Sequence, residues 1–214
     1  MQIWDIQHNQ LAELPESLGS LSKLRFLYLG GNKLQTLPKT FENLKNLLYL
    51  NLTYNQFISL PDSLGGLSNL IELRLYKNQL LSLPDTIGNL VKLKELYVME
   101  NQLTQLPLSI GKLTNLRKLM LENNQLNTLP ASIGDLKKLT DLDLRSNQII
   151  HLPESIGQLK ALRFLDLRAN QLTELPTTLQ KLSNLEKLDL RLNKTLLLPD
   201  WLPKLVKKGC TVFV

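Results

Sequence analysis

The side chains that could act as nucleophiles, bases or metal ligands are few in this sequence. A thiol nucleophile needs a base within hydrogen-bond reach, and paired carboxylates can serve as acid and base in a glycosidase. The candidates for such roles are Cys210, His8, His151 and the regularly spaced Asp143, Asp166 and Asp189. Whether any of them meet depends on the elements that position them.

The spacing of the aspartates, 23 residues, runs through the whole chain. Asparagine recurs at this spacing nine times, at Asn9, Asn32, Asn55, Asn78, Asn101, Asn124, Asn147, Asn170 and Asn193. Proline does the same at Pro15, Pro38, Pro61, Pro84, Pro107, Pro130, Pro153, Pro176 and Pro199. A fixed period in this range indicates a solenoid built from one repeated unit.

Each unit begins with alternating apolar and polar residues, as in LTDLDLRSN over 139–147. This alternation predicts a strand with one buried face, and identical units side by side predict a parallel sheet with one strand per repeat. The strands should centre on Leu27, Leu50, Leu73, Leu96, Leu119, Leu142, Leu165 and Leu188. We expect the asparagine amides to turn inward and bond buried backbone groups.

The return segment of each unit reads Leu-Pro, then Ser or Thr two residues after the proline, as at Ser155, except in the last unit, where Trp201 stands there. This pattern predicts a short helical turn capped by the hydroxyl, with Ile156 and Leu159 facing inward. A glycine such as Gly157 then either allows tight packing or closes the turn in a left-handed conformation. Because these turns are wider than the strand spacing, we expect the sheet to lie on the concave side of a curved stack.

These motifs resemble the leucine-rich repeat family, in particular its 23-residue class with LPxxIGxLxxL, over Met1 to about Leu205. That class includes the intracellular Ras-group proteins and similar bacterial proteins. The resemblance implies an α/β solenoid, the leucine-rich repeat horseshoe, and a scaffold for signalling proteins, with small GTPases among the candidate partners. We expect one domain over 1–214, with nine repeats over about 1–207 and a C-terminal cap over about 199–214.

Composition and charge argue against several functions. Although the net charge is +6, the concave positions of the last three repeats carry five basic and five acidic side chains, so we expect no nucleic-acid groove. Six repeats would hold His8 and His151 about 29 Å apart. Arginines flank the aspartates and keep them ionised. We therefore predict no enzyme activity, cofactor or metal, no membrane contact, and a reducing cytoplasmic location, since Cys210 stands alone and no signal peptide opens the chain.

Aromatic residues gather at the concave positions of repeats two to six. All five tyrosines of the chain fall there, and a phenylalanine and two methionines extend the group. A large apolar patch with polar handles is typical of a binding site, whereas aromatic side chains also simply suit strands. The group comprises Phe26, Tyr28, Tyr49, Tyr54, Tyr76, Tyr97, Met99 and Met120.

Repeats seven to nine carry a second pattern in which an aspartate and an arginine stand two residues apart. Side chains two apart on a strand share one face, so the two columns can form a self-neutralising lattice of weak ion pairs or a charged half-site that orients a partner. Both readings stay open, and they are compatible. The residues are Asp143, Arg145, Asp166, Arg168, Asp189 and Arg191.

The two ends depart from the pattern. The first repeat has no polar cap, so Met1, Ile3, Trp4 and Ile6 should lie on an open edge where a partner or a second copy could bind. At the other end we expect Trp201 and a last strand to close the core. Cys210, Val212 and Val214 would face inward there, although a slip of one residue would turn Thr211 and Phe213 inward instead.

The sequence therefore predicts a non-enzymatic protein-binding module or scaffold that grips a partner on its concave face. Two alternatives remain, a structural or self-associating role and a bacterial surface or secreted adhesion protein.

Overall fold

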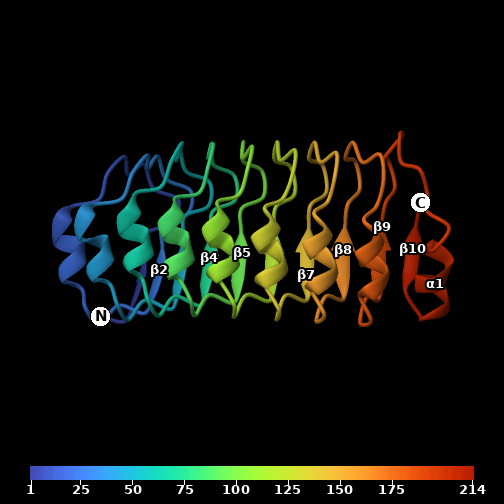
Figure 1. Ribbon diagram of the computed structural model, residues 1–214. Coiled ribbons are helices and arrows are strands. Elements are labelled where there is room, and N and C mark those ends of the chain that lie inside the picture. The colour runs from blue at the N-terminus through green and yellow to red at the C-terminus, as the bar shows by residue number, and fades with distance from the viewer.

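The computed structural model describes residues 1–214 as a single row of repeats in two layers, with the chain ends at opposite ends of the row (Figure 1). One layer is an open parallel sheet of ten strands in chain order. The strands are β1 Ile3–Asp5, β2 Phe26–Tyr28, β3 Tyr49–Asn51, β4 Glu72–Arg74, β5 Glu95–Tyr97, β6 Lys118–Met120, β7 Asp141–Asp143, β8 Phe164–Asp166, β9 Lys187–Asp189 and β10 Thr211–Phe213.

The other layer consists of eight 3-10 helices of five residues and one α-helix, α1. The 3-10 helices are η1 Glu16–Ser20, η2 Lys39–Asn43, η3 Asp62–Gly66, η4 Asp85–Asn89, η5 Leu108–Lys112, η6 Ala131–Asp135, η7 Glu154–Gln158 and η8 Thr177–Lys181, and α1 is Leu202–Lys207. No helix has the length and apolar character needed to cross a membrane.

The strand register follows the leucines. Each predicted centre is confirmed, and pairs such as Leu50 with Leu73 lie opposite each other in adjacent strands. These central leucines are buried in one continuous core that runs between the sheet and the helices. Because side chains alternate along a strand, a slip of one residue would move every central leucine to the outer face.

The asparagine column confirms the predicted role of the amides. The Nδ2 of Asn147 donates to the carbonyl of Leu144 in its own repeat and to that of Leu121 in the preceding one, both at 3.0 Å. Its Oδ1 accepts the backbone N–H of Leu126, also at 3.0 Å. Each amide thus joins two repeats through backbone groups that would otherwise be buried without partners. At the open end the corresponding Asn9 is exposed.

The predicted hydroxyl caps are wrong. Proline occupies the position before each 3-10 helix and no side chain caps it, because Ser or Thr stands two residues farther on, inside the helix. Some hydroxyls point instead to the preceding repeat. Thr40 donates to the carbonyl of Glu16 at 2.5 Å, and Thr178 donates to that of Glu154 at 2.6 Å. The hydroxyl therefore can join neighbouring helices instead of closing its own.

Of the two roles offered for the helical glycines, the structure supports tight packing. A Cβ on Gly157 would lie 2.5 Å from Thr178 of the next repeat, which no real side chain tolerates. Repeat two has Glu42 at this position, and there the following repeat makes room with Gly66, whose added Cβ would lie 2.4 Å from the Glu42 Cβ. Small residues thus set how closely successive helices approach.

At the C-terminal end, α1 and β10 follow the last repeat. The helix was not predicted, although Pro203 suits its first turn. Leu202, Leu205 and Cys210 are buried, and Val212 packs half-buried against the core. The inward prediction is wrong for Val214, which is 66% exposed because β10 ends one residue earlier.

At the N-terminal end, β1 pairs only with β2 and leaves its other edge free. Met1 and Ile3 are 61% and 59% exposed, while Trp4 and Ile6 pack partly buried against the core. The open edge expected for these four residues is present in the structure.

Candidate functional site

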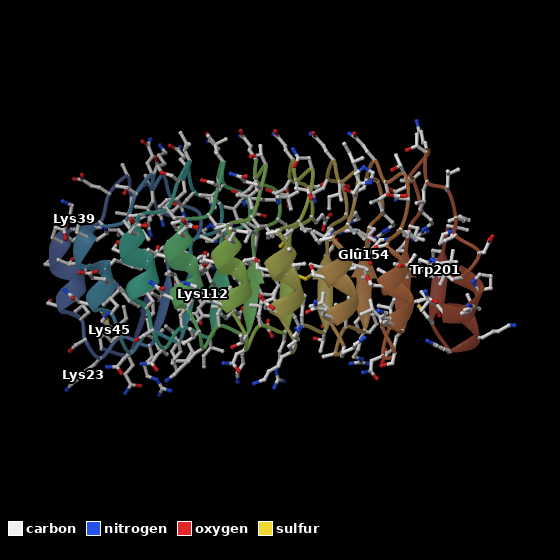
Figure 2. All side chains as sticks on the ribbon, viewed as in Figure 1. Lys23, Lys39, Lys45, Lys112, Glu154 and Trp201 are labelled. Atoms are coloured by element: carbon white, nitrogen blue, oxygen red, sulfur yellow. The ribbon has the colours of Figure 1, made fainter.

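All the candidate site residues lie on the outer side of the strands or just beyond the strand ends, and we call this surface the sheet face. It is the face predicted to be concave. The helices cover the other side of the core, where Lys45, Lys112 and Glu154 lie in Figure 2. Because adjacent strands are in register, outward residues of neighbouring repeats form columns, as with Phe26 beside Tyr49.

The aromatic half of the sheet face, β2 to β6 with the segments that follow them, brings the predicted aromatic residues and methionines together. The rings of Tyr28 and Tyr49 lie 4.9 Å apart, and those of Tyr54 and Tyr76 lie 5.7 Å apart. Most of these side chains are half-buried, but Tyr54 is 49% exposed. Among the five tyrosines only Tyr97 donates its hydroxyl to another side chain of the protein.

Charged side chains interrupt this patch, which sequence reasoning missed. Arg74 lies in the column of Tyr28 and Tyr97 and places its guanidinium 5.6 Å from the ring of Tyr49 and 5.3 Å from that of Tyr97. It also pairs with Glu72 at 2.6 Å. A cation held over the rings therefore joins the Tyr28–Tyr49 pair to Tyr97, and the patch is not one apolar surface. The sequence does contain this information, since Glu72 and Arg74 both occupy outward positions of a strand.

Tyr97 is held by a neighbouring carboxylate. Its hydroxyl donates to Glu95 at 2.5 Å, and Glu95 also pairs with Lys118 at 3.3 Å. Burial, together with this carboxylate, raises the pKa of Tyr97. Burial alone would raise the pKa of Glu95, but the bonds from Tyr97 and Lys118 outweigh it and lower that pKa. Tyr97 is thus a fixed hydroxyl donor at the edge of the aromatic half.

The charged half of the sheet face, β7 to β9 with the segments that follow them, has a structural role that sequence reasoning missed. The Oδ1 of each aspartate accepts the backbone N–H two residues on, at 3.0 Å for Asp143, 3.1 Å for Asp166 and 3.4 Å for Asp189. Asn51 does the same in β3 at 3.0 Å. At these four strands a side-chain oxygen, from either an acid or an amide, gives this backbone N–H a partner.

The predicted lattice of ion pairs forms in β8 and β9. Arg168 binds both carboxylate oxygens of Asp166 and lies 3.4 Å from Asp189, while Arg191 binds both oxygens of Asp189. Asp189 has no exposed surface. Its burial alone would raise its pKa, yet the bonds from Arg191 outweigh that effect and lower the pKa below the usual aspartate range.

The lattice fails in β7. The guanidinium of Arg145 turns to Glu122 of the preceding repeat, and its nearest approach to the carboxylate of Asp143 is 3.7 Å. The Nε of Arg145 is buried without a partner. Burial raises the pKa of Asp143, because no close cation compensates the cost of its charge.

A hollow of about 240 Å³ opens on the sheet face beside Asp143. Its polar lining is Asp141, Asp143, Asp166 and Lys187, and its apolar lining includes Met120 and Phe164.

Comparisons with known proteins agree with this architecture. The family model described as the leucine-rich repeat region matches residues 2–120, more than half of the chain, and a second leucine-rich repeat model matches residues 92–149 and 114–172. This chain belongs to the leucine-rich repeat family. No curated protein matches it significantly.

Solved structures of leucine-rich repeat proteins resemble the chain. The ectodomain of the Arabidopsis thaliana receptor kinase GASSHO1/SCHENGEN3, in complex with CASPARIAN STRIP INTEGRITY FACTOR 2, is 37% identical with a TM-score of 0.78. The match covers 89% of this chain and 24% of that ectodomain, so the chain spans about a quarter of the ectodomain's length. The plant peptide hormone receptor RGFR1, in complex with RGF2, is 28% identical with a TM-score of 0.64, over 89% of this chain and 36% of that one.

The remaining candidates for chemistry stay apart in this leucine-rich repeat protein. His151 lies away from the strands and faces Glu174 at 3.7 Å, whereas His8 follows β1. Cys210 is buried, and burial raises the pKa of its thiol, which disfavours the reactive thiolate. No three His, Cys, Asp or Glu side chains gather as metal ligands would. Leucine-rich repeat domains are generally non-enzymatic modules for protein interactions.

Proposed function

We propose that this chain is a non-enzymatic protein-binding module that grips a polypeptide partner on its sheet face. The observation that carries the proposal is the placement of the tyrosines. All five lie on that face and none is buried; they form one tilted ring pair, one edge-to-face ring pair and one hydroxyl donor.

Tyrosine suits this role for physical reasons. It offers a large contact area at low conformational cost and a hydroxyl that can bond a partner. The rings of Tyr28 and Tyr49 already lie against each other, and their strands are held by the leucine core and the asparagine column. Little side-chain conformational freedom is therefore lost on binding, which favours affinity.

We assign the charged half of the sheet face a different part, that of orienting the partner. Arg168 and Arg191 are bonded within the chain, so they gain less from new contacts than a free side chain would. Their charges act at longer range, where they set the orientation and rate of encounter.

The partner in this proposal is a polypeptide. The resemblance to receptor ectodomains solved with CASPARIAN STRIP INTEGRITY FACTOR 2 or RGF2 supports a protein partner in general. The likeness to the 23-residue Ras-group class adds an intracellular signalling protein, such as a small GTPase, as the candidate, with the cytoplasm as its location.

A second candidate function is self-association through the N-terminal edge. The free edge of β1 and the exposed Ile3 favour it, since an unpaired strand edge can template another strand. Sedimentation over a range of protein concentrations tests this candidate. A mass that rises with concentration in the wild type, and stays monomeric in Ile3→Lys, supports it.

An affinity pull-down tests the main proposal. The bait is the wild-type chain, the Tyr49→Ala, Tyr76→Ala double variant, or Lys45→Ala as a control on the helix side. We expect a protein captured by the wild type and the control but lost from the double variant. Equal capture by all three baits would contradict binding through the aromatic half.

A further inference from the structure

We propose that the hollow on the charged half receives a basic side chain, an arginine guanidinium, from an extended segment of the partner. This inference rests on the proposed function, because the segment belongs to the polypeptide that the sheet face binds. It adds the chemistry of one contact residue on that polypeptide.

The free carboxylate oxygen of Asp143 is the first observation. In β8 and β9 both oxygens of the aspartate are bonded by an arginine of the same repeat. In β7 the Oδ1 of Asp143 accepts a backbone N–H, but its Oδ2 has no cation closer than the 3.7 Å of Arg145. The Oδ2 of Asp143 can therefore accept a hydrogen bond from a guanidinium, as the Oδ2 atoms of Asp166 and Asp189 already do within the chain.

Glu122 explains why only this repeat is left open. Arg145 is the first arginine of its column, and the column residue before it is Glu122. Arg145 bonds the carboxylate of Glu122. Arg168 and Arg191 have no such carboxylate before them in the column, because each of them follows another arginine. Asp143 thus lacks an arginine partner because its repeat borders the aromatic half of the sheet face, which supplies Glu122.

The walls of the hollow fit a guanidinium rather than a bare cation. Phe164 lines it beside the aspartates, and the guanidinium of Arg163 already lies 5.1 Å from the centre of that ring. A planar guanidinium can bond a carboxylate through two N–H groups while its face rests on an aromatic ring. Met120 adds an apolar wall for the aliphatic part of the side chain.

The charge balance in the hollow is also complementary. Three aspartates line it, Asp141, Asp143 and Asp166, against one cation, Lys187. Arg168 neutralises Asp166. The lining therefore stays acidic, because the other nearby cation, Arg145, bonds Glu122 and approaches Asp143 only to 3.7 Å, and an incoming arginine complements this charge. Asp141 and Asp143 project from the same strand about 6.6 Å apart, so one guanidinium can lie between them.

An NMR titration with a short peptide tests the inference without the partner. The probe is N-acetyl-Gly-Arg-Gly-amide, and the control is the same peptide with citrulline, which keeps the shape and loses the charge. We expect the arginine peptide to shift the Asp143 carboxyl carbon and the Phe164 ring in a saturable way at millimolar concentration. The citrulline peptide should bind about tenfold more weakly, because it lacks the charge-assisted bonds.

Two variants sharpen the test. Asp143→Asn should fold, since Asn51 makes the same backbone bond in β3, and it should weaken the response to the arginine peptide about tenfold. Asp85→Asn removes the same charge from an exposed position on η4 and should leave the response unchanged. Equal shifts with both peptides, or an undiminished response in Asp143→Asn, would overturn the inference.

This result is separable from the fate of the proposed function. The tripeptide should bind the Tyr49→Ala, Tyr76→Ala variant as it binds the wild type, because the hollow lies outside the aromatic clusters. If the tripeptide binds while the tyrosine variant still captures the partner, the proposed function fails alone. If the tyrosines matter to the partner and the tripeptide gives no specific shift, the guanidinium site fails alone.

Discussion

The aromatic and charged halves of the sheet face share one backbone and differ in how far their side chains are satisfied within the chain. In the aromatic half a single tyrosine of the five donates its hydroxyl internally. In the charged half Arg168 and Arg191 each bind both oxygens of an aspartate. Unused bonding capacity favours affinity for a partner, whereas internal bonds favour a fixed surface.

Each half contains one exception, and both arise from neighbours across the strands. Arg74 sits among the tyrosines because the rings on both sides and Glu72 hold it. Asp143 lacks its arginine because Glu122 of the preceding repeat binds Arg145. The bonding partner of an outward side chain therefore depends on its neighbours in adjacent repeats as much as on its own repeat.

The largest expected effect is a loss of stability on removing asparagines from the column that both halves share. Asn55→Ala in the aromatic half and Asn170→Ala in the charged half should each lower the free energy of unfolding by about 3 kcal/mol, since buried backbone groups lose their partners. Urea unfolding measures both. A loss much smaller at one site than at the other would show that the two halves do not rest on the same scaffold.

A smaller effect should separate the halves. Asp189→Ala should cost about 2 kcal/mol of unfolding free energy, because its buried carboxylate accepts charged hydrogen bonds from Arg191. Tyr76→Ala should cost less, since its hydroxyl is not bonded within the chain and its ring is partly exposed. If the tyrosine variant were the less stable of the two, the aromatic half would be structural.

The scaffold could be predicted from the sequence because the same residue pattern recurs in every repeat. The strand centres and the inward asparagines follow from a period that nine repeats enforce. The hydroxyl caps were wrong because the residue type suits a cap while its position, two residues inside the helix, does not. The contacts of Arg74 and Arg145 could not be predicted, since a repeat pattern does not rank the carboxylates and rings within reach of a long side chain.

The pH dependence of stability should have opposite signs at two aspartates. Burial raises the pKa of Asp143, so its ionisation opposes folding, and this cost grows as the pH rises through the folded pKa. The pKa of Asp189 is lowered, so its stabilisation is lost as the pH falls through the folded pKa. At neutral pH, Asp143→Asn should therefore gain stability and Asp189→Asn should lose it.

Urea unfolding of these two variants at neutral and acidic pH makes the check. Both differences from the wild type should shrink once the pH falls below about 4, where aspartates are protonated in the unfolded chain. Changes of the same sign at neutral pH would contradict the electrostatic difference between the two sites.

The smallest effect concerns the orienting charges. Arg168→Ala should weaken partner binding by less than about 1 kcal/mol, because its guanidinium is already bonded to Asp166 within the chain and gains little from a new contact. It should mainly slow association, and added salt should remove the difference between the variant and the wild type. Stopped-flow association rates at two salt concentrations measure this. A change confined to dissociation would make Arg168 a contact residue.

The most direct measurement is the dissociation constant of the partner captured by the wild-type chain, determined by calorimetric titration for Tyr49→Ala and for the helix-side variants Lys45→Ala and Lys137→Ala. Binding through the aromatic half predicts a loss of about 2 kcal/mol for the tyrosine variant, with unfolding still cooperative and folded spectra retained. The two lysine variants should bind as the wild type does. Unchanged affinity in Tyr49→Ala, together with lost binding in Lys45→Ala or Lys137→Ala, would place the partner on the helices instead.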